Sequence, residues 1–385
     1  MAAINVFTSI NRIIQGRGAI SQLADEVIRF KARKILIVTD CGLVSTPIPS
    51  MVKSLLKDFA VDIFSAVEPD PSIETINACA GYVREHKFDL LIGLGGGSPI
   101  DTAKCASVLA LNPGSAEDYL GIEKIERAGI PKIFIPTTAG TGSEVTNVAV
   151  LSLKAAHTKK GIVSRYLFAE AAILDPELTL GLPSPVTAAT GMDALTHAIE
   201  AYVSRFAQPL TDHFALEAIR LIGRSLRTAV HNGQNVDARE AMLTGSMYAG
   251  LAFGSAATGM VHGLAMPLGG QFNIAHGTAN AVMLPHVMRH NLVSSLERYR
   301  DVAIALGERV EHLSVRQGAE RAISAVEALS ADIGIPGYLD DLSIPKSAIA
   351  DLAKDGMNNV RQIRPNPRDV TYEGLLAILH GAFRP

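Results

Sequence analysis

The sequence predicts a chain of two domains: an N-terminal α/β domain built on a parallel sheet and a C-terminal domain made of helices. Short apolar runs alternate with helical stretches from about residue 34 to residue 135, as strands alternate with covering helices in a parallel sheet. Strand-like runs almost vanish after Pro183 and Pro185. A chain of 385 residues is also too long for one ordinary core. We therefore expect domains at residues 1–183 and 184–385.

The strands expected in the first half are short, apolar and followed by turn residues. They are KILIVTD at 34–40, VDIFSAV at 61–67, DLLIGLGGG at 89–97 and KIFIPTT at 132–138. Helices are expected between them, beginning near Pro47, over SIETINACAGYVREH with Ser72 as its cap, and over 99–111.

Composition excludes several classes of protein. Apolar residues make up 48% and charged residues 19%, which is typical of a globular chain, and a net charge of −3 provides no basic surface for nucleic acid. No apolar run approaches the roughly 18 residues of a membrane helix, and the N-terminus lacks the pattern of a signal peptide. The three widely spaced cysteines fit reduced thiols. We expect a soluble, cytoplasmic protein with no nucleic-acid or membrane partner.

A glycine-rich segment joins the third expected strand to the next helix. In LLIGLGGGSPIDTAK, Gly96 and Gly97 allow the main chain to approach a phosphate, Ser98 adds a hydroxyl and Pro99 suits a first helical turn. The helix N-terminus would supply free N–H groups and a partial positive charge. Asp101 is expected either to cap this helix or to contact a cofactor. The segment alone is also compatible with a tight structural turn, since it matches neither GxGxxG nor a P-loop.

A second polar loop follows the next expected strand, in PTTAGTGSEVT at 136–146. Thr137, Thr138 and Thr141 supply hydroxyls, and two such loops at strand ends favour a ligand site over two structural turns. Asp40 ends the first expected strand, where a carboxylate could accept a hydrogen bond from a ribose 2′-OH and so favour NAD over NADP. A solvated turn aspartate is the alternative interpretation.

Four residues of the second half are typed and spaced like a divalent-metal site: Asp193, His197, His262 and His276. Asp193 and His197 are four residues apart, on one helix face. A buried unpaired carboxylate is costly in their apolar surroundings, and a metal would remove that cost. One carboxylate and three imidazoles suit zinc or iron equally.

Three nearby residues leave alternatives open. His286 and His290 are also four apart, and a helix-packing or surface pair is the preferred interpretation over a rival ligand pair. Glu200 is compatible both with an acceptor behind a ligating imidazole and with an ordinary helix salt bridge.

The segments GGGSPID, PTTAGTGSE, GMDALTHAIEAY, GMVHGLAMPLGG and HGTANAVMLPHVMRHN together resemble the iron-containing (group III) alcohol dehydrogenase family, and the resemblance spans nearly the whole chain. It implies a dehydroquinate-synthase-like nucleotide domain, a helical metal domain, Fe(II) in preference to zinc, and a homodimer. It implies metal ligation by Asp193, His197, His262 and His276, and adenosine-side contacts by Asp40 and Asp70. It also implies that the cofactor is lined by Gly97, Ser98, Asp101, Thr137, Thr138, Thr141 and Lys160.

The resemblance predicts reversible NAD-linked oxidation of a small primary alcohol to its aldehyde. Phe253 is a candidate wall of the substrate pocket, with a plain core role as the alternative. The family commonly has a histidine four residues after the third ligand, where this chain has Met266. Methionine cannot carry a proton, so a proton relay through this position is in doubt. A non-redox, NAD- and metal-using lyase of the dehydroquinate-synthase type is the alternative function.

Overall fold

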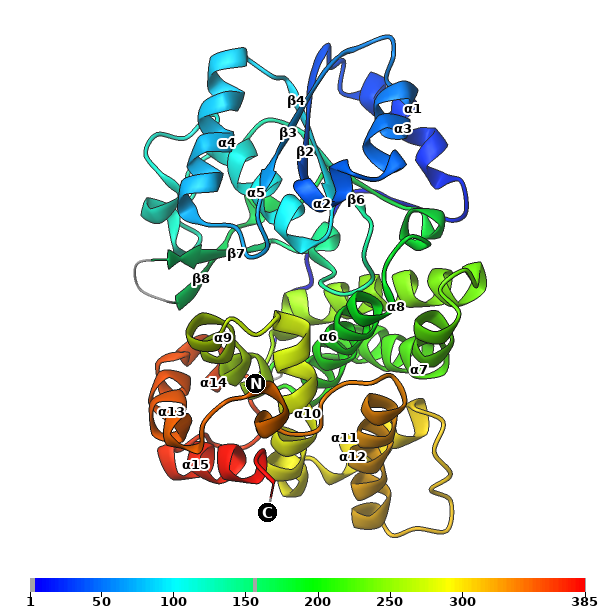
Figure 1. Cartoon of the computed structure of the whole chain (residues 1–385), viewed down its shortest axis with the longest axis vertical. Coiled ribbons are helices and arrows are strands. Elements are labelled where there is room, and N and C mark those ends of the chain that lie inside the picture. The colour runs from blue at the N-terminus through cyan, green and yellow to red at the C-terminus, as the bar shows by residue number, and fades with distance from the viewer. Residues whose placement is uncertain (1–3, 155–157, 385) are drawn as a thin grey trace. The chain divides into compact units, whose positions relative to one another are not determined.

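The structure is a computed structural model that describes residues 4–154 and 158–384. The chain divides into an α/β unit, Ser9–Gly181, and a helical unit that begins at Leu182 and also includes the segment up to Thr8 (Figure 1). The two units divide between Gly181 and Leu182. The N-terminal segment is grouped with the helices because the Val6 carbonyl accepts from Gln208 and Phe7 stacks on Phe214.

The core of the α/β unit is a six-stranded sheet whose strands are all parallel. Its order is β1 (Ile13–Gln15), β9 (Ala171–Leu174), β6 (Lys132–Pro136), β4 (Leu90–Gly95), β2 (Lys34–Asp40) and β3 (Ala60–Val67). The predicted parallel sheet and its four named strands are confirmed. The short edge strand β1 and strand β9 were not expected, because three or four residues do not produce a recognisable apolar run.

Alternate residues of the strands build two separate cores, one on each face of the sheet. Ile35 and Ile37 of β2 lie in a cluster with side chains of α1 (Leu23–Arg29) and α3 (Pro47–Leu55). Their neighbours Leu36 and Val38 pack with α4 (Ile73–His86) and α5 (Gly97–Leu109). Figure 1 shows these helix pairs on opposite sides of the strands. Ser72 caps α4, as predicted, by accepting from the Thr75 N–H.

A second, three-stranded sheet corrects the prediction for the segment after residue 138, where no strand was expected. β7 (Val148–Leu153) and β8 (Thr158–Val163) pair antiparallel, and β5 (Gly121–Ile122) adds to β8. The short helix α2 (Cys41–Val44) follows β2 directly. Lysine, threonine and glycine dilute the apolar alternation of β8, so its sequence carried a weak strand signal.

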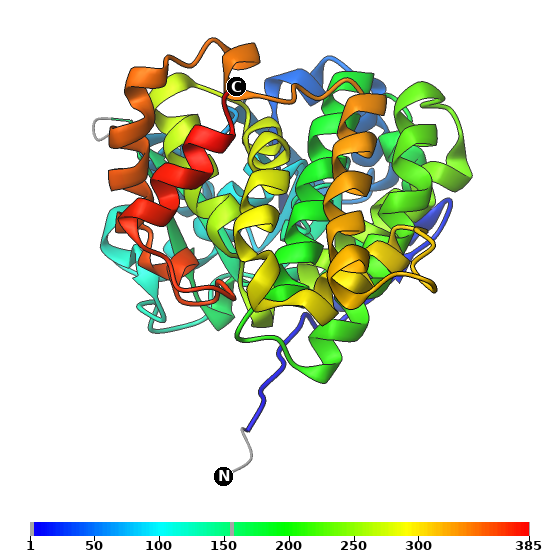
Figure 2. The ribbon, with the colours of Figure 1, turned by 90° about the horizontal axis from the view of Figure 1, so that it is seen from below.

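The helical unit contains no strand among its described residues, which confirms the all-α prediction. Its helices are α6 (Ser184–Val203), α7 (Pro209–His231), α8 (Val236–Ala256), α9 (Met260–Phe272), α10 (His276–Asn291), α11 (Leu296–Ala305), α12 (Val315–Asp332), α13 (Ile349–Asn358), α14 (Val360–Ile363) and α15 (Tyr372–Gly381). Several of these helices lie side by side in Figure 2.

Small residues allow the central helices to approach closely. A Cβ added to Gly191 of α6 would lie 2.3 Å from Leu226 Cδ1 of α7, and one on Gly245 of α8 would lie 2.8 Å from Ile222 Cγ1 of α7. The packing of α6 fixes the position of the carboxylate and imidazole that it carries. Within the described ranges, no single helix is long and apolar enough to cross a membrane. Taken together, α8 and α9 have the length and apolar composition of a membrane span, but the two helices are bent by 104° at their junction.

Candidate metal centre and nucleotide loops

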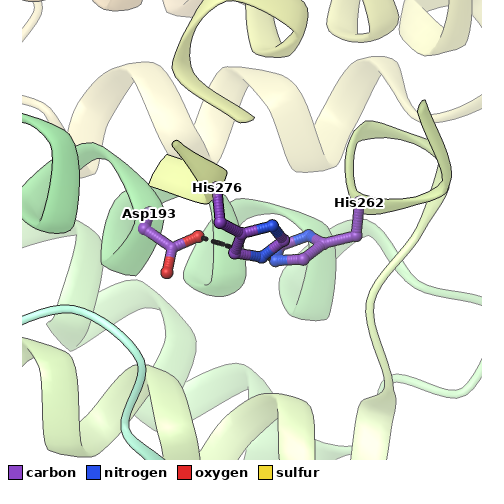
Figure 3. A group of neighbouring side chains, drawn as sticks. All are labelled: Asp193, His262 and His276. Carbon is purple, nitrogen blue, oxygen red and sulfur yellow. Dashed lines mark ion pairs between the residues drawn. The ribbon is translucent and has the colours of Figure 1, made fainter. Parts of the chain in front are cut away.

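Three helices of the helical unit bring three of the predicted ligands together. Asp193 lies in the middle of α6, His262 in the first turn of α9, and His276 is the first residue of α10. One ligand atom from each lies within 4.8 Å of the others. The Nε2 atoms of His262 and His276 are 3.7 and 3.8 Å from Asp193 Oδ1, and the rings converge on this carboxylate in Figure 3.

His197, the fourth predicted ligand, lies beside this group. Its buried ring stacks on His262 with centroids 4.5 Å apart, and on Phe253 at 4.3 Å with the planes 18° apart. Within the described chain, the group with mutual distances under 4.8 Å contains Asp193, His262 and His276 but not His197. The geometry therefore brings three of the four candidate ligands together and leaves the fourth, His197, adjacent.

The charge states of these residues favour a bound cation. Burial by itself raises the pKa of Asp193, but His197, His276 and His262 outweigh it and hold that pKa below its usual value. Burial, followed by the nearby His197 and His276, holds the pKa of His262 well below its usual value. An ionised carboxylate beside a neutral imidazole is the state in which both bind a metal.

Glu200 lies behind His262 and sets the orientation of its ring. Glu200 Oε1 accepts from the Val261 N–H at 2.6 Å, and Oε2 lies 2.6 Å from His262 Nδ1. We assign the His262 proton to Nδ1, facing Glu200 Oε2, so that the lone pair of Nε2 faces Asp193 and His276. Burial raises the pKa of Glu200 to about 7. Of the two interpretations weighed from the sequence, this contact with the imidazole favours the acceptor behind the ring.

Asn280 is a residue of this centre that the sequence did not reveal. It is buried on α10, one turn after His276, and Nδ2 donates to Asp193 Oδ1 at 2.7 Å. The only signal available was its spacing of four residues from a candidate ligand, which one sequence cannot distinguish from chance.

The rival pair His286 and His290 does not join this group. Both lie further along α10, where burial lowers the pKa of each ring. His286 packs near Tyr338 and His290 near Gly374, and no group of potential metal ligands in the described chain includes them. This agrees with the helix-packing interpretation.

The two candidate pocket residues lie on the helices that surround the centre. Phe253, half-buried on α8, packs face to face on His197. Met266 is half-buried on α9, one turn after His262.

In the α/β unit, the two polar loops pack against each other at the carboxyl ends of β4 and β6. Gly95 has φ +143°, a conformation that favours glycine. A Cβ on Gly97 would lie 2.8 Å from Thr141 Cγ2, and one on Gly96 would lie 3.4 Å from Thr138. The contact between the loops therefore requires glycine at Gly97, whereas a Cβ at Gly96 would make only an ordinary van der Waals contact.

The neighbouring strand ends contribute the two predicted aspartates. Asp40 ends β2 and caps α2, since Oδ1 accepts from the Leu43 N–H at 2.8 Å, and its Oδ2 faces Gly95. The N–H of Asp70 donates to Ser98 Oγ at 3.1 Å. The Thr137 N–H donates to the Gly95 carbonyl. Residues far apart in sequence thus meet at the carboxyl ends of the strands, where open α/β sheets bind ligands.

Asp101 has a role that neither sequence alternative included. Oδ1 accepts from Ser143 Oγ at 2.5 Å, Oδ2 accepts from the Val150 N–H at 2.8 Å, and Lys104 Nζ lies 3.6 Å away. The buried Lys104 ammonium also donates to Ser143 Oγ. Asp101 is therefore an internal link from α5 to the second loop and β7, and its direct contact with a cofactor remains a prediction.

Adjacent lysines of β8 differ in their surroundings. Lys160, the residue named by the resemblance, is exposed, whereas Lys159 is buried and pairs with Asp70 Oδ2 at 2.7 Å. Successive side chains of a strand point to opposite faces, so only one of the two can reach the loops. The sequence KK does not show which one does.

The chain matches known proteins over almost its whole length. Residues 11–176 match the model described as iron-containing alcohol dehydrogenase, and residues 187–383 match that of the Fe-containing alcohol dehydrogenase family, C-terminal. Long-chain-alcohol dehydrogenase 1 of Geobacillus thermodenitrificans (strain NG80-2) is 46% identical over 383 residues, which cover 98% of this chain and 96% of that protein.

Solved structures agree. A crystal structure of 1,3-propanediol oxidoreductase has a TM-score of 0.96 at 39% identity and covers 99% of this chain and 100% of that one. Sulfoacetaldehyde reductase from Bifidobacterium kashiwanohense, solved in complex with NAD+, has a TM-score of 0.89 at 31% identity, with 99% of both chains covered. These matches support an oxidoreductase and not the lyase alternative. This chain, with its Asp–His–His group and paired polar loops, belongs to the iron-containing alcohol dehydrogenase family.

Proposed function

We propose that the enzyme interconverts a small primary alcohol and its aldehyde, with NAD as the hydride carrier and a divalent metal at the Asp193–His262–His276 group. The observation that carries this proposal is the buried convergence of one carboxylate and two imidazole nitrogens, with His262 held in the ligating tautomer by Glu200. The relatives named above act on alcohols or aldehydes by name, and one was solved with NAD+.

The residues present fit a first-row divalent ion. Asp193 Oδ1, His262 Nε2 and His276 Nε2 all face the Asn280 amide nitrogen, at 2.7, 3.2 and 3.2 Å, and each is an atom type that binds such an ion. The donor set alone suits zinc as well as iron. The family favours Fe2+. Held there, the ion would supply Lewis-acid polarisation of the alcohol oxygen, and NAD would supply the hydride acceptor or donor.

Side chains around the metal centre set its charge, its ligands and the lining of the substrate pocket. Asp193 supplies negative charge, and Glu200 holds the His262 proton at Nδ1, away from the ligating nitrogen. His197 is proposed as the fourth ligand because it lies one turn from Asp193 and against His262. Phe253 and Met266 are proposed to line the substrate pocket. Since Met266 carries no proton, the proton of the alcohol must leave through water or another group.

The loops of the α/β unit are proposed to hold NAD. Gly96, Gly97 and Ser98 present the N-terminus of α5 to the pyrophosphate, with Thr137, Thr138 and Thr141 opposite. Asp40 and Asp70 face the adenosine side. Here we propose Lys159 in preference to Lys160, because Lys159 is the buried cation paired with Asp70. Asp101 acts through Ser143 on the second loop.

Turnover measurements test this function. The wild type should oxidise NADH in the presence of short aldehydes, and His262→Ala should reduce kcat/KM by about 100-fold or more, because metal polarisation contributes several kcal/mol. His286→Ala removes a buried histidine of α10 outside the centre and is the matched control. Absence of turnover in the wild type, or equal turnover in wild type and His262→Ala, would contradict the proposal.

Two further properties are proposed on family resemblance: a homodimer and a cytoplasmic location. Light scattering of the purified protein tests the first, and fractionation of the source cells tests the second. A monomeric mass or a non-cytoplasmic fraction would overturn the respective proposal.

A further inference from the structure

Three potential metal-ligating atoms surround a single amide nitrogen. Asn280 is fully buried on α10, and its Nδ2 donates to Asp193 Oδ1 at 2.7 Å. The same Nδ2 lies 3.2 Å from His262 Nε2 and 3.2 Å from His276 Nε2. One nitrogen therefore faces a ligand atom of every residue in the group.

The orientation of this amide is dictated by its neighbours. The Asp193 carboxylate oxygen Oδ1 lies 2.7 Å from the amide nitrogen and accepts its N–H. We assign the proton of His262 to Nδ1, which lies 2.6 Å from Glu200 Oε2, and this leaves Nε2 as a second acceptor. Rotating the amide by half a turn would place Asn280 Oδ1 against these acceptors, which repel it. The N–H donors must therefore point into the centre.

This orientation has a cost that supports a specific role. Asn280 Oδ1 is buried and has no hydrogen-bond partner in the described part of the chain. A buried acceptor without a partner is unfavourable, and such groups in native structures require an explanation. In Asn280, the amide oxygen lacks a partner because the amide nitrogen is turned toward the candidate ligand atoms.

We propose that Asn280 is a positioning residue of the metal centre. It holds Asp193 Oδ1 toward the ion, and in the metal-free protein it keeps the two imidazole nitrogens gathered around the same point. An NH2 group has two hydrogens and cannot fully satisfy three acceptors. When a cation enters, the imidazole lone pairs turn to it while the hydrogen bond to Asp193 remains. This inference rests on the metal centre proposed above.

Cobalt binding tests the inference without depending on turnover. Co2+ affinity is measured by competition with a chelator, and the geometry of the bound ion by visible absorption. Asn280→Leu removes the donor and should weaken Co2+ binding about 10- to 100-fold, as loss of an outer hydrogen bond to a ligand typically does. Asn280→Asp keeps the shape but replaces the donor with a carboxylate oxygen, and should change the absorption spectrum.

Two controls separate the possible failures. Asn112→Leu removes another buried amide, which donates to Val108 and Arg127 in the α/β unit, and should leave Co2+ affinity unchanged. Asp193→Ala should abolish tight binding, and if it does not, the proposed metal centre itself is wrong. If Asp193→Ala abolishes binding but the Asn280 variants keep wild-type affinity and spectrum, the role of Asn280 is overturned. Should Asn280→Leu fail to fold, Asn280→Asp decides the question by the same two measurements.

Discussion

The two candidate sites are built in opposite ways. In the α/β unit, the groups that would hold NAD lie on short loops at strand ends, and each loop is a run of consecutive residues such as 95–98. In the helical unit, the ligands are single side chains on separate helices, and the Asn280 amide bonds to a carboxylate 87 residues earlier. Each loop is therefore encoded locally, although the loops meet only in the folded sheet, whereas the metal centre has no local part and exists only when α6, α9 and α10 are packed.

Each unit also contains a buried glutamate, and the two glutamates differ in their hydrogen-bond partners. Burial raises the pKa of Glu200 in the helical unit and of Glu144 in the α/β unit, each to about 7. Glu200 receives hydrogen bonds from Val261 and His262, whereas Glu144 Oε1 has no hydrogen-bond partner in the described residues. The same substitution at the two positions should therefore have opposite consequences.

Glu200→Gln should have the larger effect. The carboxylate accepts from two N–H donors with its two oxygens, but glutamine has one oxygen, so one donor would face an NH2 group. We expect metal affinity to fall about 10- to 100-fold, measured by chelator competition. Glu26→Gln changes a buried glutamate of the α/β unit paired with Arg12 and Arg29, and should leave metal affinity unchanged. Equal metal affinity in Glu200→Gln and wild type would contradict the orienting role.

Glu144→Gln should stabilise the protein at high pH. A carboxyl whose folded pKa lies above its unfolded value binds more protons when folded, so its contribution to stability is lost as the pH rises from about 4.5 to about 7. Glutamine does not titrate, and the variant should gain on the order of 2 kcal/mol over the wild type across this range. The gain in stability is measured from the unfolding midpoints of the variant and the wild type at the two ends of this pH range. Parallel stability curves for the two proteins would show that Glu144 is not buried in its charged form.

Gly97→Ala should have the smallest effect and should act only on the α/β unit. The added methyl group would lie 2.8 Å from Thr141 Cγ2, so the second loop must move. We expect NADH affinity to fall about tenfold, the effect of losing roughly one good hydrogen bond to a phosphate, while metal affinity is retained. Gly81→Ala on α4 meets no atom within 4 Å and is the matched control. Fluorescence titration measures the NADH affinity of both variants. Equal NADH affinities for Gly97→Ala and Gly81→Ala would show that the contact between the loops does not shape the site.

The sequence was informative where local chemistry decides the structure. The alternation of buried strands and capped helices predicted the parallel sheet, because β2, β3, β4 and β6 each carry their own apolar signal. The β7–β8 hairpin was missed, because its alternation is weak and its stability comes from pairing between strands.

The sequence by itself determined the two-part architecture, the glycine loops and the identity of the candidate ligands, because periodicity, turn residues and ligand types are properties of short segments. Only the tertiary structure decided which groups support them. It buried Lys159 beside Asp70 and left Lys160 exposed, placed Asp101 behind the second loop, and set Glu200 and Asn280 around the histidines. Those roles depend on hydrogen-bond geometry between elements that meet only after packing, and a buried polar group is defined by its partners.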